Sequence, residues 1–162
     1  GQGFERGSIF VPQLLMSAEA TKAAFDVVKE AMQGQAQEKK GKVVLATVKG
    51  DIHDIGKNIV KVLLENYAFD VIDLGKDVPP GKIVEAAMDP EVRLVGLSAL
   101  MTTTVPSMEE TIRLLREREA GVQVVVGGAV LTPEYAARMG ADCYARDAMA
   151  TVHFAQQIYG CG

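Results

Sequence analysis

Five short apolar runs, separated by segments with helical spacing, constrain the fold of this 162-residue chain more than any other feature. Continuous apolar runs that alternate with helices are typical of parallel strands buried under helices on both faces of a sheet. We predict strands at 43–48, 70–74, 94–98, 122–126 and 142–144, followed by helices at 56–67, 81–88, 107–119, 132–139 and 148–159. Five such units predict an α/β fold, a flavodoxin-like, doubly wound sheet of five parallel strands in the order 2-1-3-4-5.

Two of the expected helices carry start signals in the sequence. Ser107-Met108-Glu109-Glu110 has the form of a capping box, in which the hydroxyl and the later carboxylate satisfy each other's backbone N–H groups. Thr132 followed by Pro133 predicts an N-cap and a first helical residue. Both signals favour helices that follow strands closely.

The residues before the first strand differ in composition from the rest. Residues 12–32 are rich in alanine and carry apolar side chains at helical spacing, which predicts one helix. The stretch that follows is polar with two glycines, which is typical of a linker. We therefore divide the chain into a helical part at 1–34, a linker at 35–42 and an α/β domain at 43–160.

Composition excludes several classes of protein. Hydrophobic residues make up 48% of the chain and the net charge is −4, so a folded domain is expected. A mildly acidic chain without a basic stripe argues against a nucleic-acid partner. No apolar run reaches the roughly 20 residues of a membrane helix, which argues against a membrane partner. Two irregularly spaced cysteines, Cys143 and Cys161, and no signal peptide predict reduced thiols in the cytoplasm.

The turn after the first strand carries the only histidine among the expected strand-to-helix loops. Asp51 stands two residues before His53, and Gly56 follows three residues after it. Loops at this edge of an open α/β sheet bind ligands. A neutral imidazole is a good ligand for a transition metal. The plain alternative is a solvated turn histidine beside an N-cap acid and a turn acid, Asp51 and Asp54.

Two further loops supply candidate binding residues. Ser98 ends the third strand, which is adjacent to the first in the expected order. Gly127 and Gly128 end the fourth strand before Ala129. Without side chains, Gly56 and Gly128 leave room for a bulky group to approach the backbone. Alone, each of these residues is an ordinary strand end or tight connection, and their joint occurrence is what favours a site.

Asp51-x-His53-x-x-Gly56, Gly96-Leu97-Ser98 and Gly127-Gly128-Ala129 together resemble the corrinoid-binding domain of the methionine synthase and corrinoid methyltransferase family. The resemblance implies cobalamin or a related cobamide in a base-off, His-on form, with His53 as the metal ligand. Asp51 would accept a hydrogen bond from the other ring nitrogen, and Ser98 would complete this relay. The implied cofactor-binding residues are Asp51, His53, Asp54, Ile55, Gly56, Ser98, Leu100, Thr102, Gly127, Gly128 and Ala129.

Residues 7–15 resemble the last part of the helical cap that precedes this domain in methyltransferases, so residues 1–34 are interpreted as a cap remnant. The implied function is to shuttle a methyl group, through Co(I) and methyl-Co(III), from a methyl-donor methyltransferase to a thiol or tetrahydropterin acceptor. A partner for reductive activation is also implied. No side chain suggests a nucleophile or an acid–base pair, so we assign no catalytic residue and expect no turnover by the chain alone.

Two alternative functions share the histidine loop. The first is the cobalamin-binding subunit of an adenosylcobalamin-dependent mutase, and the second is a non-enzymatic cobalamin sensor. The segment from Gly50 to Val60 is more similar to the methyltransferase branch, and a photoreceptor would be expected to carry a DNA-binding module. A phosphoacceptor receiver domain would need an aspartate after the third strand, where this chain has Ser98 and Ala99.

Overall fold

The computed structural model describes residues 39–161 with the exception of residue 119. The predicted cap remnant, its helix at 12–32 and the first part of the linker lie outside the described residues. The described elements are β1 (Lys42–Thr47), α3 (Ile55–Asn66), β2 (Asp70–Asp73), α4 (Pro80–Ala87), β3 (Val92–Ser98), the short 3-10 helix η1 (Thr102–Thr104), α5 (Val105–Glu117), β4 (Gln123–Gly127), α6 (Pro133–Arg138), β5 (Cys143–Tyr144) and α7 (Ala148–Tyr159).

The five strands form one parallel sheet in the order β2-β1-β3-β4-β5. The predicted fold class and strand order are thus confirmed. Because β1 and β3 are neighbours while their helices leave on opposite faces, the loops after β1 and β3 flank the switch point of the sheet. Within the described part of the chain, no helix is long and apolar enough to cross a membrane.

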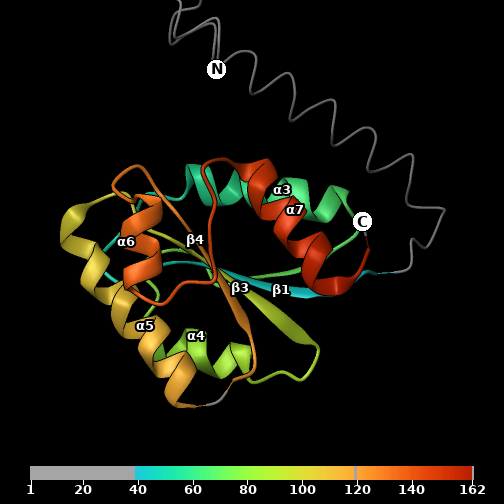
Figure 1. Ribbon diagram of the computed structural model, residues 1–162, viewed down its shortest axis with the longest axis horizontal. Helices are drawn as coiled ribbons and strands as arrows, with labels where there is room; N and C mark the ends of the chain where they lie inside the picture. Colours follow the sequence, from blue (N-terminus) through green and yellow to red (C-terminus); the bar gives the residue numbers. More distant parts are fainter. Residues whose placement is uncertain (1–38, 119, 162) are drawn as a thin grey trace, which may run out of the picture. The chain divides into compact units, whose positions relative to one another are not determined.

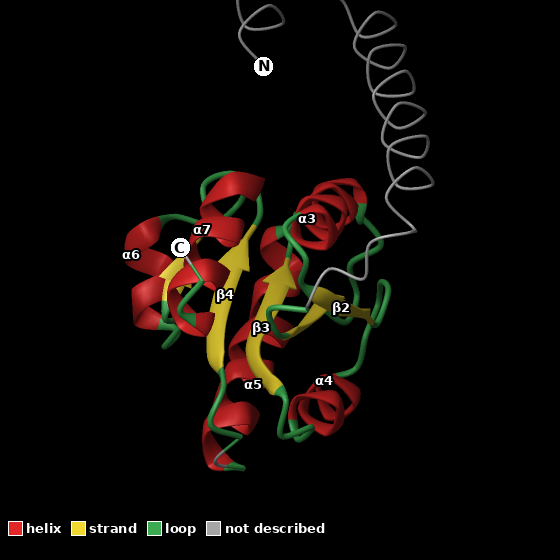
Figure 2. Ribbon diagram, turned by 90° about the vertical axis from the view of Figure 1, so that its right-hand side faces the viewer, coloured by secondary structure: helices red, strands yellow, loops and turns green. Residues whose placement is uncertain are grey.

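Helices cover both faces of the sheet (Figures 1 and 2). On one face α3 and α7 pack over Val43, Leu45 and Leu94, and on the other α4, α5 and α6 pack over Val44, Ala46 and Val95. Both sets of strand side chains are almost fully buried, so the strands are apolar on both faces. This double burial explains the continuous apolar runs in the sequence.

One predicted helix start is confirmed and the other is wrong. The Thr132 hydroxyl accepts a hydrogen bond from the Tyr135 N–H at 3.2 Å, and Pro133 opens α6. Helix α5, however, begins at Val105 because η1 leads directly into it. Ser107 therefore lies inside the helix, where its carbonyl accepts a hydrogen bond from the Thr111 hydroxyl at 2.7 Å. The predicted capping box is not formed.

Tyr159, the last residue of α7, ties this helix to the sheet. The register between β1 and β3 shifts after Lys42, which leaves Arg93 out of the ladder. The Tyr159 hydroxyl accepts a hydrogen bond from the Arg93 N–H at 2.8 Å and donates one to the Lys42 carbonyl. One phenol thus satisfies both backbone groups of the irregular step, and it fixes the position of α7 above the sheet.

Candidate cofactor-binding site

The loop between β1 and α3 presents His53 toward solvent while fixing its ring. Nδ1 of the imidazole lies 2.7 Å from Oδ1 of Asp51, and the same oxygen accepts the backbone N–H of His53 at 2.9 Å. An ionised carboxylate only accepts hydrogen bonds, so in the neutral imidazole Nδ1 carries the proton and Nε2 keeps its lone pair. The side chain of His53 is 46% exposed. This tautomer is the one that offers Nε2 to a metal.

Asp51 is fully buried behind the histidine. Burial by itself raises the pKa of a carboxyl group, but four hydrogen bonds outweigh it here. The donors are the backbone N–H groups of Leu100 and His53, the His53 ring and the Thr104 hydroxyl, and together they lower the pKa of Asp51 to about 2. The carboxylate therefore stays charged near neutral pH and holds the imidazole in one orientation.

The hydroxyl that completes this relay belongs to Thr104, which corrects the expectation for Ser98. Thr104 Oγ1 donates to Asp51 Oδ2 at 3.1 Å, and the Leu100 N–H donates to the same oxygen at 2.6 Å. The turn at η1 brings Thr104 inward, while Ser98 at the end of β3 borders a cavity instead. A run of three threonines, Thr102–Thr104, follows Ser98 closely in the sequence, and its third member is the buried hydroxyl that reaches Asp51.

A second loop supports the histidine loop from the side of β2. The backbone N–H of Asp77 donates to the Asp51 carbonyl at 2.9 Å, and Asp77 Oδ1 accepts the Gly50 N–H at 2.7 Å. Asp77 adopts a positive φ of 53°, which suits an aspartate in a tight turn. His53 is thus positioned by three neighbouring loops, those after β1, β2 and β3.

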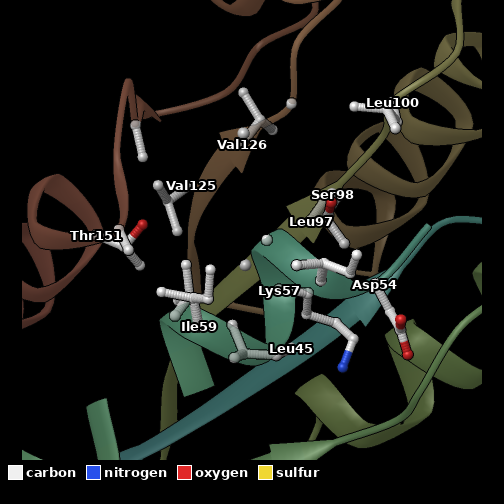
Figure 3. A pocket seen from close by; sticks show the side chains of 18 of the residues that line it. Leu45, Asp54, Lys57, Ile59, Leu97, Ser98, Leu100, Val125, Val126 and Thr151 are labelled. Atoms are coloured by element: carbon white, nitrogen blue, oxygen red, sulfur yellow. The ribbon is translucent and has the colours of Figure 1, made fainter. Parts of the chain in front are cut away.

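A cavity of about 800 Å³ opens beside His53 and extends along the sheet face under α3 and α7. Figure 3 shows its lining, with Ile59 contributed by α3 and Thr151 by α7. Residues 45, 96 and 125, which are paired in register across β1, β3 and β4, also line the cavity. It therefore reaches from the carboxyl edge of the sheet into the domain.

Most predicted binding residues border this cavity. They are His53, Asp54, Ile55, Gly56, Ser98, Leu100, Gly127, Gly128 and Ala129. Asp51 lies behind His53, and Thr102 is exposed on η1 outside the lining. Sequence reasoning missed Gly96, Arg146 and Thr151, because it considered only the loops after the first, third and fourth strands. An isolated glycine within a strand, such as Gly96, is a recognisable signal of close approach.

The glycines at the cavity have different roles. A Cβ at Gly56 would meet nothing within 4 Å, so the space beside the start of α3 is open. A Cβ at Gly96 would lie 2.5 Å from Cδ2 of Leu45, so glycine keeps the sheet face low at this point. At Gly128, by contrast, φ is 146° and a Cβ would lie 1.7 Å from the carbonyl oxygen of Ala99. Glycine at position 128 is therefore required by the backbone, whether or not a ligand is bound.

A buried lysine anchors the first turn of α3. The amino group of Lys57 donates to Asp73 Oδ1 at 2.6 Å and to Asn58 Oδ1 at 2.9 Å, and its side chain is nearly inaccessible. Burial would raise the pKa of Asp73, but the contacts with Lys57, the Gly75 N–H and Lys61 lower it overall. This pair joins the helix that follows the histidine loop to the end of β2.

These features fit a metal macrocycle that carries a long substituent. The imidazole could offer one nitrogen to the metal, and the exposed apolar side chains of Ile52 and Ile55 (78% exposed) offer a surface beside it for a flat ring. The open space at Gly56 and the cavity provide room for the substituent.

Comparison with known proteins agrees with this geometry. A family model described as the B12 binding domain matches residues 41–153, which contain the whole cavity. The chain belongs to the B12-binding domain family. A second model, also described as a B12 binding domain, matches residues 1–29. Membership shows that the cofactor of this domain is cobalamin or a related cobamide.

Individual relatives cover nearly all of the chain. It is 44% identical over 158 residues to dimethylamine corrinoid protein 1 of Methanosarcina acetivorans, which is 96% of this chain and 74% of that protein. A cobalamin-binding protein from Desulfitobacterium hafniense has a similar structure, with a TM-score of 0.75 and 36% identity over 97% of this chain and 75% of that one. The methanol:cobalamin methyltransferase complex MtaBC of Methanosarcina barkeri contains a similar chain, with a TM-score of 0.74 and 31% identity over 99% of this chain and 62% of that one.

Proposed function

We propose that this B12-binding domain is the cobamide carrier of a methyltransferase system and that His53 is the lower axial ligand of its cobalt. The contact between Asp51 and Nδ1 of His53 carries the proposal, because it fixes the tautomer that presents Nε2 outward. The nucleotide tail, displaced from the metal, would occupy the cavity between the sheet and helices α3 and α7. When bound, the cofactor supplies the chemistry of accepting and releasing a methyl group.

The residues of this chain bind and orient the cofactor rather than react. Asp51 holds the imidazole and increases its basicity, and Thr104 holds Asp51 in turn. The exposed side chains of Ile52 and Ile55 would contact the ring, and the cavity would hold the tail. None of these groups delivers or removes the methyl group, so donor and acceptor come from partners.

The relatives suggest which partners to test first. The curated relative is named for dimethylamine, and the complex from Methanosarcina barkeri is named for methanol. We propose a methyl-donor methyltransferase for a methylated amine as the first partner, a thiol or tetrahydropterin methyltransferase as the acceptor, and a reductase that returns the cobalt to its reactive state. The methyltransferase context of the relatives favours this function over a mutase subunit or a sensor.

Electron paramagnetic resonance of the reconstituted protein tests the axial ligand directly. The parent chain is loaded with cob(II)alamin, and the superhyperfine splitting by the axial nitrogen is recorded with natural-abundance and ¹⁵N-histidine-labelled protein. A triplet that becomes a doublet in the labelled protein is expected. Labelled His53→Ala should lose the doublet, while labelled His153→Ala, which changes an exposed histidine on α7, should keep it.

A triplet that persists in the ¹⁵N-labelled protein would show that the cofactor's own base remains on the cobalt. That result would overturn the proposed ligand while leaving the assignment to the family intact.

A further inference from the structure

The cavity contains one cation that has no partner among the described residues. The ionisable side chains in its lining are His53, Asp54, Lys57, Tyr144, Arg146 and Asp147. The imidazole of His53 is bound to Asp51, and the amino group of Lys57 is paired with Asp73. The carboxylate of Asp147 caps α7 by accepting the Ala150 N–H at 2.9 Å. The guanidinium of Arg146 forms no hydrogen bond or ion pair in the described part of the chain.

The backbone on both sides of Arg146 is fixed. The N–H of the preceding residue, Ala145, donates to the Val126 carbonyl at 2.9 Å, which attaches the loop to the end of β4. The following residue, Asp147, is the N-cap of α7. The backbone around Arg146 is therefore fixed at the cavity wall, while its side chain is exposed and is not used by the fold. In the sheet, β3 and β4 separate this loop from the one that carries His53.

A cobamide carries its negative charge in a defined place. The amide side chains of the corrin ring are neutral, whereas the phosphodiester of the nucleotide loop is an anion near neutral pH. A guanidinium binds phosphate oxygens through parallel N–H donors, and this paired geometry makes arginine well suited to bind a phosphodiester. The free cation in the wall and the single anion of the tail are therefore complementary.

We propose that Arg146 binds the phosphodiester of the cobamide's nucleotide loop and makes the site selective for corrinoids with a complete tail. This inference rests on the proposed function, because the nucleotide loop enters the cavity only when the tail has left the cobalt. The corrin ring is then held at His53, and the tail is held on the opposite wall. A corrinoid without the tail brings no phosphodiester, so Arg146 stays unpaired and the corrinoid binds with lower affinity.

Titration with two corrinoids tests this role. Dissociation constants for cobalamin and for cobinamide, which lacks the phosphodiester and the base, are measured by absorbance for the parent, Arg146→Gln and Arg146→Lys. Arg146→Gln should weaken cobalamin binding about five- to tenfold and leave cobinamide binding unchanged. Arg146→Lys should retain most of the affinity. Arg113→Gln, an exposed change on α5, serves as the matched control and should alter neither constant.

Salt dependence and the resonance spectrum separate the possible failures. The affinity of the parent for cobalamin should fall with ionic strength more steeply than that of Arg146→Gln, since an ion pair is screened by salt. If Arg146→Gln lost equal affinity for cobalamin and cobinamide, Arg146 would contact the ring, and the phosphate assignment would be overturned. Unchanged affinity for cobalamin would also overturn it, and a histidine doublet in the same sample would show that the proposed ligand is still correct. A parent that binds neither corrinoid would overturn both proposals.

Discussion

On the side of the sheet covered by α4, α5 and α6, buried side chains such as Met108, Ile112 and Leu115 fill the space between helix and strand. On the side covered by α3 and α7, a cavity of about 800 Å³ reaches down to the strands (Figure 3). The smaller cavity of about 340 Å³ between α4 and α5 is lined by residues at or beside those two helices and does not reach the strands.

The difference shows how one sheet combines a stable core with a binding site. Burial of apolar side chains on the α5 side stabilises the fold without a ligand. The α7 side leaves apolar surface and room that a ligand can fill, and a ligand that binds only the folded state adds stability by mass action. Residues on the first side should therefore affect unfolding, and cavity residues should affect mainly cofactor binding.

Truncating one side chain on each side of the sheet should give the largest difference in the free energy of unfolding. Ile112→Ala removes a buried side chain from α5 and should lower the free energy of unfolding by about 2–5 kcal/mol. Ile59→Ala changes a side chain that is 52% exposed at the cavity, and it should cost less than about 1 kcal/mol in the cofactor-free protein. Urea unfolding measures both values. With cobalamin present, Ile59→Ala should lose additional free energy of unfolding relative to the parent. An equal loss with and without cofactor would contradict the contrast between the two sides of the sheet.

Two glycines at the same cavity provide the second test. Gly128→Ala places a Cβ against the Ala99 carbonyl at a positive φ, so it should destabilise the protein by about 2–3 kcal/mol or more, even without cofactor. Gly56→Ala lies in α3 with open space around it and should raise stability by up to about 1 kcal/mol. Thermal unfolding of both variants measures the effect of backbone strain on stability, and cobalamin titration measures the effect of lost space on affinity. If Gly128→Ala melts like the parent, the close approach to Ala99 is wrong.

Acid unfolding provides the third test, because Asp51 belongs to the site and is buried like the core. Its pKa is lowered from 3.8 to about 2 by hydrogen bonds that outweigh burial. The stabilisation is therefore fully present above about pH 4 and is lost as the pH falls toward 2. The shift corresponds to about 2 kcal/mol. Asp51→Asn should be less stable at neutral pH and should show a shallower loss of stability below pH 4.

The matched control for this experiment is Asp54→Asn in the same loop. The side chain of Asp54 accepts no hydrogen bond from the described residues, so its removal should leave the acid limb of the urea-unfolding profile close to that of the parent. If the two variants lose the same stability between pH 4 and pH 2, the hydrogen bonds to Asp51 do not lower its pKa as described.

The sequence predicted the fold well because apolar periodicity reports burial directly. The predicted helix at 148–159 agrees with α7 at both ends, and the strand order follows from the alternation of five βα units. The capping box at Ser107 failed because η1 precedes α5 and moves the helix start to Val105. A 3-10 turn of this length has no strong sequence signal.

The site was predicted in part, since a motif names residues but does not orient them. Asp51 and His53 were identified correctly as a hydrogen-bonded pair, because two residues in one turn have little freedom. Which hydroxyl reaches Asp51 depends on the path of the chain after β3. The sequence suggested Ser98, whereas the turn at η1 brings Thr104 to the carboxylate. Thr102 is absent from the cavity lining, and Arg146, on the loop after β5, is part of it.

The smallest expected effect separates those competing hydroxyls. Thr104→Val keeps the shape of a buried side chain but removes the donor to Asp51, so it should cost about 1 kcal/mol and weaken cobalamin binding modestly. Ser98→Ala removes a hydroxyl that borders the cavity, and its effect on unfolding should be within about 0.5 kcal/mol. A double-mutant cycle with Asp51→Asn distinguishes the two, because only a direct partner of the carboxylate shows coupling. Coupling of Asp51 to Ser98 rather than to Thr104 would support the relay through Ser98 that the sequence predicted. It would also mean that the turn at η1 rearranges when the cofactor binds.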